Sequence, residues 1–182
     1  MTAPIPDPIA LLRGCIRDVP DFPKAGIVFK DITPLLAHPP AFRAAIELLC
    51  ERVGARDADC VVGIESRGFI FGAPVADRLG IGFAPARKPG KLPYKRVSER
   101  YQLEYGEDAI EMHEDAVHGR RVVVVDDLLA TGGTARAAVR LCERLGAKVV
   151  GAVFVVELGF LDGRRRLEGL PVDALVGYGE PR

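Results

Sequence analysis

Two acidic residues and a threonine- and glycine-rich run follow four consecutive valines in this 182-residue chain. Asp126 and Asp127 come directly after Val122–Val125, and after two leucines the run is Ala130, Thr131, Gly132, Gly133, Thr134. Glycines permit close approach and unusual backbone angles, so several N–H groups of this run can point at one anion. A helix that begins here adds the positive potential of its N-terminus. The pattern predicts a phosphate-binding loop.

The acid pair indicates a second role beside the phosphate. Carboxylates suit the vicinal hydroxyls of a ribose, or the magnesium ion that accompanies a polyphosphate. The chain contains no Gly-x-x-x-x-Gly-Lys-Ser/Thr loop, and Gly80-Ile81-Gly82 lacks the third glycine of a dinucleotide fingerprint. The alternative is a strand-to-helix turn with solvated acids and no ligand.

The elements that must position these residues alternate between strand and helix. Buried strands are predicted over residues 60–64, 82–86, 122–125, 149–156 and 172–176. Helices are predicted to start at Asp7-Pro8, to span 42–54 and 69–79 (the latter with a kink or a late start at Pro74), and to follow Thr134 up to Gly146. This order predicts an α/β fold, a mostly parallel sheet flanked by helices. Ligands bind outside the carboxyl ends of such strands, which is where residues 126–134 lie.

Composition excludes several classes of protein. Hydrophobic residues make up 48% and charged residues 27%, which is typical of a folded domain, and we expect one domain over 1–182. The 25 basic and 25 acidic residues cancel, so neither nucleic acid nor a membrane is an expected partner. The N-terminal MTAPIPDPIA lacks the features of a signal peptide, and four scattered cysteines show no metal-binding spacing. A cytoplasmic location is expected.

Residues 124–134, VVDDLLATGGT, resemble the phosphoribosyl-pyrophosphate loop of the type I phosphoribosyltransferases. Three further segments resemble the branch of that family that uses adenine: 22–34, 63–69 (GIESRGF) and 103–106 (LEYG). The resemblance covers about residues 15–178. It implies that adenine and phosphoribosyl pyrophosphate (PRPP) react to AMP and pyrophosphate. It also implies that Mg²⁺ is carried by PRPP and water rather than by a dedicated protein site.

The resemblance assigns roles around PRPP. Residues 130–134 would hold the phosphate, and Asp126 and Asp127 the ribose and magnesium. Pyrophosphate would be bound by Glu65, Ser66, Arg67, Arg87, Lys88 and Lys91. An unusual, cis peptide is implied in the turn at Glu65, and Arg87 would reach across the interface of a homodimer. The simpler alternatives are a surface ion pair for Arg67 and a solvated basic face for the other three.

The resemblance also assigns the catalytic loop and the adenine site. Residues 95–113 are predicted to form a mobile two-stranded excursion, in which Glu104 would exchange the N7 proton of adenine and Tyr105 would cover the site. Residues 1–35 would include a small hood over the base. Its adenine-binding residues would be Val28, Phe29 and Lys30, with Leu158 on the other face of the ring, although Phe29 could instead fill the core.

Two rival functions remain. One is a phosphoribosyltransferase for a 6-oxopurine or for orotate, although the 6-oxopurine enzymes usually carry an aspartate in the phosphate loop, where this chain has glycine. The other is a regulator that senses PRPP without catalysis. Such proteins usually add a DNA-binding segment or a basic face, and Glu104 favours catalysis.

Overall fold

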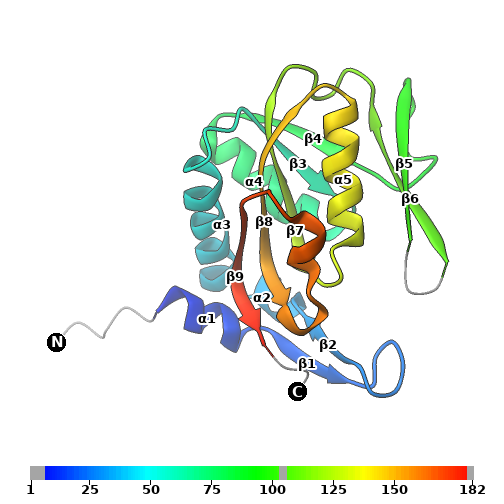
Figure 1. The fold of residues 1–182 in the computed structure, drawn as a ribbon. Helices are drawn as coiled ribbons and strands as arrows, with labels where there is room; N and C mark the ends of the chain where they lie inside the picture. Colours follow the sequence, from blue (N-terminus) through cyan, green and yellow to red (C-terminus); the bar gives the residue numbers. More distant parts are fainter. Residues whose placement is uncertain (1–6, 103–105, 180–182) are drawn as a thin grey trace.

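A five-stranded parallel sheet forms the centre of the protein (Figure 1). The computed structural model describes residues 7–102 and 106–179. The strand order is β4-β3-β7-β8-β9, with neighbours parallel throughout. The strands are β3 (Cys60–Ile64), β4 (Gly82–Ala86), β7 (Arg121–Leu129), β8 (Lys148–Leu158) and β9 (Val172–Tyr178). The predicted mostly parallel α/β fold is confirmed.

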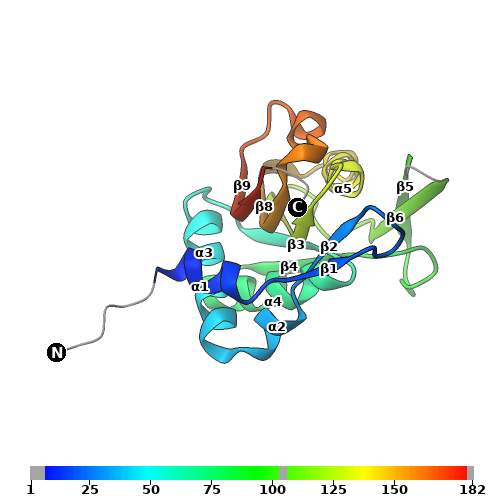
Figure 2. The same ribbon diagram turned by 90° about the horizontal axis from the view of Figure 1, so that it is seen from below.

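Helices cover both faces of the sheet, as the view from below shows (Figure 2). Helices α3 (Pro39–Gly54) and α4 (Arg67–Leu79) pack on one face, and α5 (Gly133–Arg144) packs on the other. Alternate residues of the valine run serve two separate cores: Val123 and Val125 join α3 and α4, whereas Val122 and Val124 join α5. All four are fully buried, which explains why the run is apolar on both faces.

The strand order of the sheet reverses between β3 and β7. From β3 it crosses through α4 to β4, and from β7 it crosses through α5 to β8 on the opposite side of the sheet. The connections that leave the carboxyl ends of β3 and β7 therefore run in opposite directions, with a helix N-terminus beside each strand end. This topological switch point is where open α/β sheets bind ligands.

A small N-terminal unit lies at the sheet end toward which the arrows of β8 and β9 point (Figure 1). It contains α1 (Pro8–Gly14), the antiparallel pair β1 (Arg17–Pro20) and β2 (Val28–Asp31), and α2 (Thr33–Ala37). Asp7 caps α1 as predicted, because its carboxylate accepts a hydrogen bond of 3.1 Å from the Ile9 amide.

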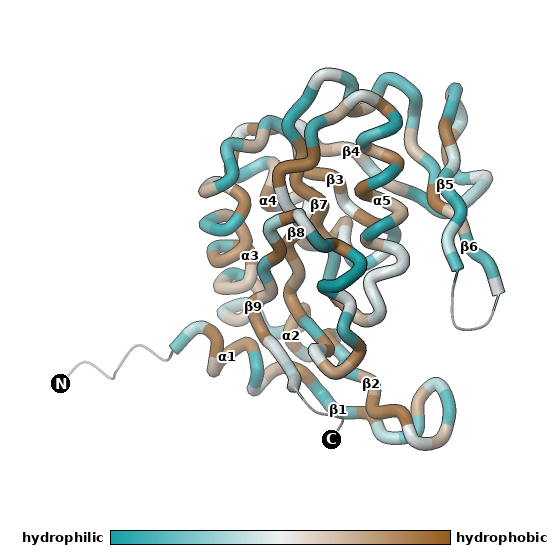
Figure 3. The backbone as a smooth tube through the Cα atoms, viewed as in Figure 1, coloured by the Kyte–Doolittle hydropathy of each residue, from teal (hydrophilic) through white to brown (hydrophobic). Residues whose placement is uncertain are grey.

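A second antiparallel pair projects beside α5. Strands β5 (Arg96–Gln102) and β6 (Glu107–His113) form the predicted two-stranded excursion. The hydropathy colouring shows largely hydrophilic strands here and hydrophobic strands at the centre of the sheet (Figure 3). Two short 3₁₀ helices, η1 (Gly159–Leu161) and η2 (Gly163–Leu167), join β8 to β9. Within the described ranges, no helix has the length and apolarity needed to cross a bilayer.

Several element boundaries differ from the sequence prediction, and three of them are informative. Strand β7 continues to Leu129, so Asp126 and Asp127 belong to a strand end rather than a loop. Asp126 pairs with Phe154 of β8. Helix α3 begins at Pro39 rather than residue 42. Helix α4 begins at Arg67 and continues through Pro74, so the predicted late start is wrong. Proline has no backbone N–H and removes one hydrogen bond from the helix, but the burial of Phe71, Val75 and Ala76 outweighs that loss.

Candidate active site

A cavity of about 320 Å³ opens at the carboxyl ends of β3 and β7. It brings together the turn after β3, the acid pair, and the start of α5. Its predicted lining residues are Glu65, Ser66, Arg67, Lys88, Asp126, Asp127, Ala130, Thr131, Gly132, Gly133 and Thr134. The cavity is also lined by residues that were not among the predicted site residues: Ile64, Leu128, Leu129 and Ala135. These four are apolar continuations of the predicted strands and helix, and nothing in their type marks them as site residues.

The threonine- and glycine-rich run forms the tight connection into α5. Gly132 is the N-cap of the helix, with φ of 79°, a left-handed conformation that side chains strain. A Cβ at Gly132 would also clash with the carbonyl oxygen of Gly163 in η2. The backbone therefore requires glycine here, and the free N–H groups of the first turn of α5 are available to an anion.

The two acids differ in their surroundings. Asp127 is only 5% exposed, and its carboxylate accepts a 2.5 Å hydrogen bond from Nε of Arg67. Asp126 accepts one from the Asp127 amide at 2.9 Å, and in the described part of the chain no cation lies within ion-pair distance of it. Burial, and then the negative charge of Asp127, raise the pKa of Asp126 well above its ordinary value. Asp126 therefore has acceptor capacity left for hydroxyl groups or a cation, either of which would stabilise its charged form.

The turn after β3 contains a cis peptide between Glu65 and Ser66, as the family resemblance implied. Helix α4 then begins at Arg67. A Cβ at Gly68 would lie 2.8 Å from the Val125 carbonyl oxygen and 2.9 Å from Oδ1 of Asp126, so glycine allows the first turn of α4 to pack directly on β7. The N-termini of α4 and α5 thus both open on the cavity.

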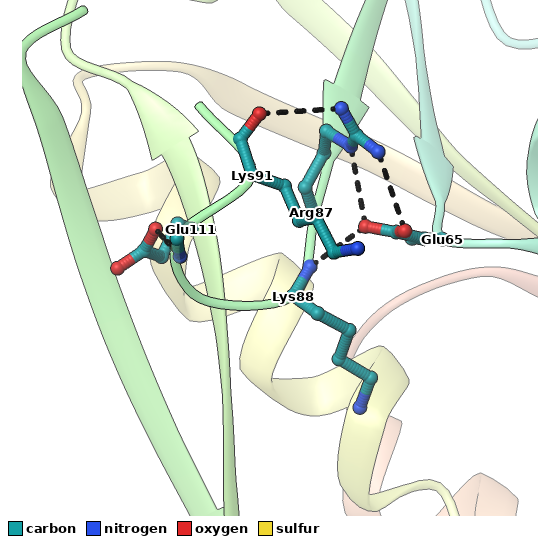
Figure 4. A network of polar contacts seen from close by, with 6 residues as sticks. Glu65, Arg87, Lys88, Lys91 and Glu111 are labelled. Carbon is teal, nitrogen blue, oxygen red and sulfur yellow. Dashed lines mark hydrogen bonds and ion pairs between the residues drawn. The ribbon is translucent and has the colours of Figure 1, made fainter. Parts of the chain in front are cut away.

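Glu65 organises the basic segment after β4 (Figure 4). Its carboxylate accepts hydrogen bonds from the Arg87 guanidinium at 3.2 and 3.3 Å and from the Lys88 amide at 2.9 Å. Arg87 also donates to the Lys91 carbonyl oxygen at 3.3 Å. Although burial raises it, the Arg87 hydrogen bonds hold the pKa of Glu65 below its ordinary value. Arg87 and Lys91 lie beside the cavity and do not line it.

Lys88 connects the cavity to the β5–β6 hairpin. Its ammonium group donates to the Tyr101 hydroxyl at 2.9 Å and to the Asp108 carboxylate, and Tyr101 and Asp108 are paired across the two strands. Burial opposes the shift, but these hydrogen bonds raise the pKa of Lys88 and lower that of Asp108. Tyr101 and Asp108 were not predicted as site residues. Only the register between β5 and β6 brings them together at Lys88, and the sequence pattern does not fix that register.

Phe29 of the N-terminal unit lies near Arg67, although it does not itself line the cavity. The Arg67 guanidinium lies 5.9 Å from the centre of the Phe29 ring, and Phe22 packs edge-on to the same ring at 5.3 Å. Phe29 and Val28 are both half-buried and outside the buried core. Phe29 therefore does not plug the core.

Lys30 and Leu158 are more deeply placed. Lys30 is 5% exposed; its Nζ donates to Asp18 at 2.6 Å and lies 4.2 Å from the centre of the Tyr178 ring. Leu158, the last residue of β8, is buried in the same core as α3 and pairs with Tyr178. Neither lines the cavity. Glu104 and Tyr105 lie outside the described residues.

Magnesium can be considered from the donor set. In the described ranges, no group of three or more His, Cys, Asp or Glu side chains could hold a metal ion. Asp127 is already paired with Arg67, so Asp126 is the carboxylate with free acceptor capacity. An ion that brings most of its ligands from a bound polyphosphate and water fits this arrangement.

Comparisons with known proteins agree on one family. The model of the phosphoribosyl transferase domain matches residues 31–173. The chain is 56% identical over 168 residues to the adenine phosphoribosyltransferase of Thermotoga petrophila, covering 92% of this chain and 99% of that one. It is 58% identical over 164 residues to that of Desulfitobacterium hafniense, covering 90% and 95%.

Solved structures give the same result. The adenine phosphoribosyltransferase of Thermoanaerobacter pseudethanolicus matches with a TM-score of 0.90 at 51% identity, covering 93% of this chain and 99% of that one. The enzyme of Saccharomyces cerevisiae, complexed with an imino-altritol bisphosphate and adenine, matches with a TM-score of 0.87 at 41% identity, covering 94% and 99%.

The conformation of Gly132 gives a test of the phosphate site. Gly132→Ala should weaken binding of inorganic phosphate or pyrophosphate roughly 10- to 100-fold, because hydrogen bonds to a charged group contribute about 1.5–3 kcal/mol each. Isothermal titration calorimetry measures it. Gly169→Ala is the control, since Gly169 also has positive φ (84°) but has open space around it and lies outside the cavity. Equal anion affinity in the two variants would contradict the placement.

Proposed function

Because the chain belongs to the phosphoribosyl transferase domain family, we propose that it transfers the phosphoribosyl group of PRPP to adenine, giving AMP and pyrophosphate. This is a pentosyltransferase reaction that salvages a purine base. One observation supports the choice of adenine as the base. More than half of the aligned residues are identical to those of adenine phosphoribosyltransferases, and the alignments cover nearly the whole length of those enzymes.

The cavity offers three subsites that match the three parts of PRPP. The first turn of α5 and Thr131 to Thr134 would hold the 5-phosphate. Asp126, whose carboxylate has acceptor capacity left, would accept hydrogen bonds from the ribose hydroxyls. Ser66, Arg67 and Lys88 would hold the pyrophosphate, with Arg87 and Lys91 supported nearby by Glu65.

The chemistry of the reaction fits this distribution of charge. Breaking the anomeric C–O bond leaves oxocarbenium character on the ribose and adds negative charge to the departing pyrophosphate. Cations and N–H donors fixed around the leaving group stabilise that charge in the transition state. Bound Mg²⁺, held through PRPP oxygens and water beside Asp126, would neutralise the pyrophosphate further.

The adenine ring would bind between the cavity and the N-terminal unit. Phe29 offers an aromatic face next to Arg67, and the main-chain groups of Val28 and Lys30 can distinguish the amino group of adenine from a 6-oxo group. Leu158 would contact the opposite face. Glu104 would accept the N7 proton as N9 attacks, and Tyr105 would cover the site.

The enzyme would act as a homodimer in the cytoplasm. The dimer rests on the family resemblance, in which Arg87 reaches across the interface. The location is supported by four free cysteines, two of them buried, which suit a reducing compartment. The substrates are small molecules, and the net charge of zero gives no attraction to nucleic acid or membranes.

A spectrophotometric assay tests the proposed function. Purified protein with PRPP and magnesium should convert adenine to AMP and should leave hypoxanthine, xanthine and orotate essentially unchanged. Turnover of a 6-oxopurine or of orotate in preference to adenine would favour another phosphoribosyltransferase. Binding of PRPP without turnover of any base would favour a regulator.

The acid pair is tested by Asp126→Asn with Asp127→Asn. We expect the apparent KM for PRPP to rise roughly 10-fold or more, the loss of one or more hydrogen bonds to a charged group, while the KM for adenine changes little. Steady-state kinetics with each substrate varied in turn measures both. Asp162→Asn, on an exposed 3₁₀ turn, is the control. A parallel rise in both KM values would count against the ribose assignment.

Glu104 carries the sharpest kinetic expectation. Glu104→Gln preserves size and removes basicity, so kcat should fall by roughly 10²–10⁴, the usual contribution of a positioned general acid or base. The Kd for PRPP should stay nearly constant, because the phosphate and pyrophosphate subsites are untouched. Glu114→Gln, an exposed acid just after β6, should behave like the unmodified enzyme. If both variants or neither lost activity, the proton-transfer role would be wrong.

A further inference from the structure

A second cavity, of about 360 Å³, lies next to the candidate active site and shares only Gly133 with it. Four elements line it: strands β5 and β6, helix α5 and the 3₁₀ helix η2. In Figure 1, β5 and η2 flank α5, and both pack against it. None of its polar side chains has a role in the proposed reaction.

Four arginines line this second cavity. Arg100 comes from β5, Arg136 and Arg140 from α5, and Arg166 from η2. The one acid in the lining is Glu107, which accepts a 2.6 Å hydrogen bond from Gln102 and lies 3.9 Å from Arg100. Three positive charges are therefore not balanced by the lining.

These three guanidinium groups also lack partners elsewhere. Within residues 7–102 and 106–179, the side chains of Arg136, Arg140 and Arg166 make no hydrogen bond or ion pair. The next arginine along the same face of α5 behaves differently: Arg144 donates to Glu99 at 2.5 Å and to the Ser98 carbonyl oxygen at 3.0 Å. The candidate active site differs too, since Arg67 pairs with Asp127 and Arg87 with Glu65.

Unpaired like charges that line one cavity repel each other, and Arg136 and Arg140 are four residues apart on one helix. A multiply charged anion removes this repulsion. Planar guanidinium groups with several fixed N–H donors match the oxygens of phosphate groups in particular. A cavity of this volume also lies in the range of small-molecule sites, which argues for a compact ligand rather than an extended polymer.

We propose that the second cavity binds a phosphate-bearing anion, such as pyrophosphate or the phosphate chain of a nucleotide, separately from the substrates in the active site. The bound anion would be held jointly by β5, α5 and η2. It would therefore link the hairpin to the helix that begins at the phosphate loop.

Equilibrium dialysis with labelled pyrophosphate tests this by counting bound anions per chain, a count that does not depend on turnover. The unmodified protein should bind one more pyrophosphate per chain than Arg140→Gln with Arg166→Gln. Both side chains belong to exposed residues that make no side-chain contact with a partner in the described part of the chain, so the fold should persist. Arg140→Gln alone should weaken the extra site roughly 10-fold, which keeps the test usable if the double variant is unstable.

Arg165→Gln is the matched control, because Arg165 adjoins Arg166, pairs with Asp162 at 3.3 Å and does not line the cavity. It should retain the extra site.

Competition with ATP distinguishes the two sources of the phosphate group: displacement of the extra pyrophosphate identifies a nucleotide site, and no displacement identifies a site for inorganic phosphates. The proposal is overturned if the double variant binds as many pyrophosphates as the unmodified protein with equal affinity. It is also overturned if Arg165→Gln loses the extra site, or if the extra site takes only an RNA oligonucleotide.

Discussion

The ion pair between Arg67 and Asp127 joins the three parts of the candidate active site. Asp127 is almost fully buried at the end of β7, and a buried carboxylate without a partner would be costly. Arg67 supplies the charge from the first turn of α4, and its guanidinium is still half-exposed to the cavity and close to the Phe29 ring. One side chain thus fixes the turn after β3 against the acid pair and the N-terminal unit. Pyrophosphate bound beside Arg67 would meet a group already oriented by Asp127.

The same principle explains how a chain of zero net charge gathers cations around one cavity. Three of the cations around the active site are held by carboxylates: Arg67 by Asp127, Arg87 by Glu65, and Lys88 by Asp108. The lowered pKa values of Glu65 and Asp108 keep these acids ionised, so the pairs persist over a wide pH range above their titration. The cost is a weaker long-range field than unpaired cations would give. The gain is that the donors are oriented before the substrate arrives, which is what stabilisation of a transition state requires.

Much of this arrangement could be predicted from the sequence, because it depends on local patterns. The valine run, the Thr-Gly-Gly-Thr turn and the order of strands and helices each follow from periodicity and glycine conformation, and together they place residues 126–134 at the switch point. Contacts that depend on strand register could not be predicted. Tyr101 and Asp108 meet Lys88 only because β5 and β6 pair with one specific offset. The packing of Gly163 on the phosphate loop joins residues about 30 positions apart, and nothing near Gly163 in the sequence indicates it.

The β5–β6 hairpin, whose strands come before and after Glu104 in the sequence, is fixed on two sides. Lys88 binds Tyr101 and Asp108 from the active-site side, and Arg144 of α5 binds Glu99 and the Ser98 carbonyl oxygen from the other. A third pair, Arg96 with Glu111 at 3.0 Å, ties the start of β5 to β6. With the strands held in this way, the position of residues 102 and 106, on either side of the segment with Glu104, is set by α5 and by the chain after β4. Lys88 therefore does more than line the cavity. If the pyrophosphate of a substrate drew its ammonium group away from Asp108, one side of the hairpin would lose that contact. Occupation of the proposed pyrophosphate subsite and the placement of the hairpin would then be coupled through this one ammonium group.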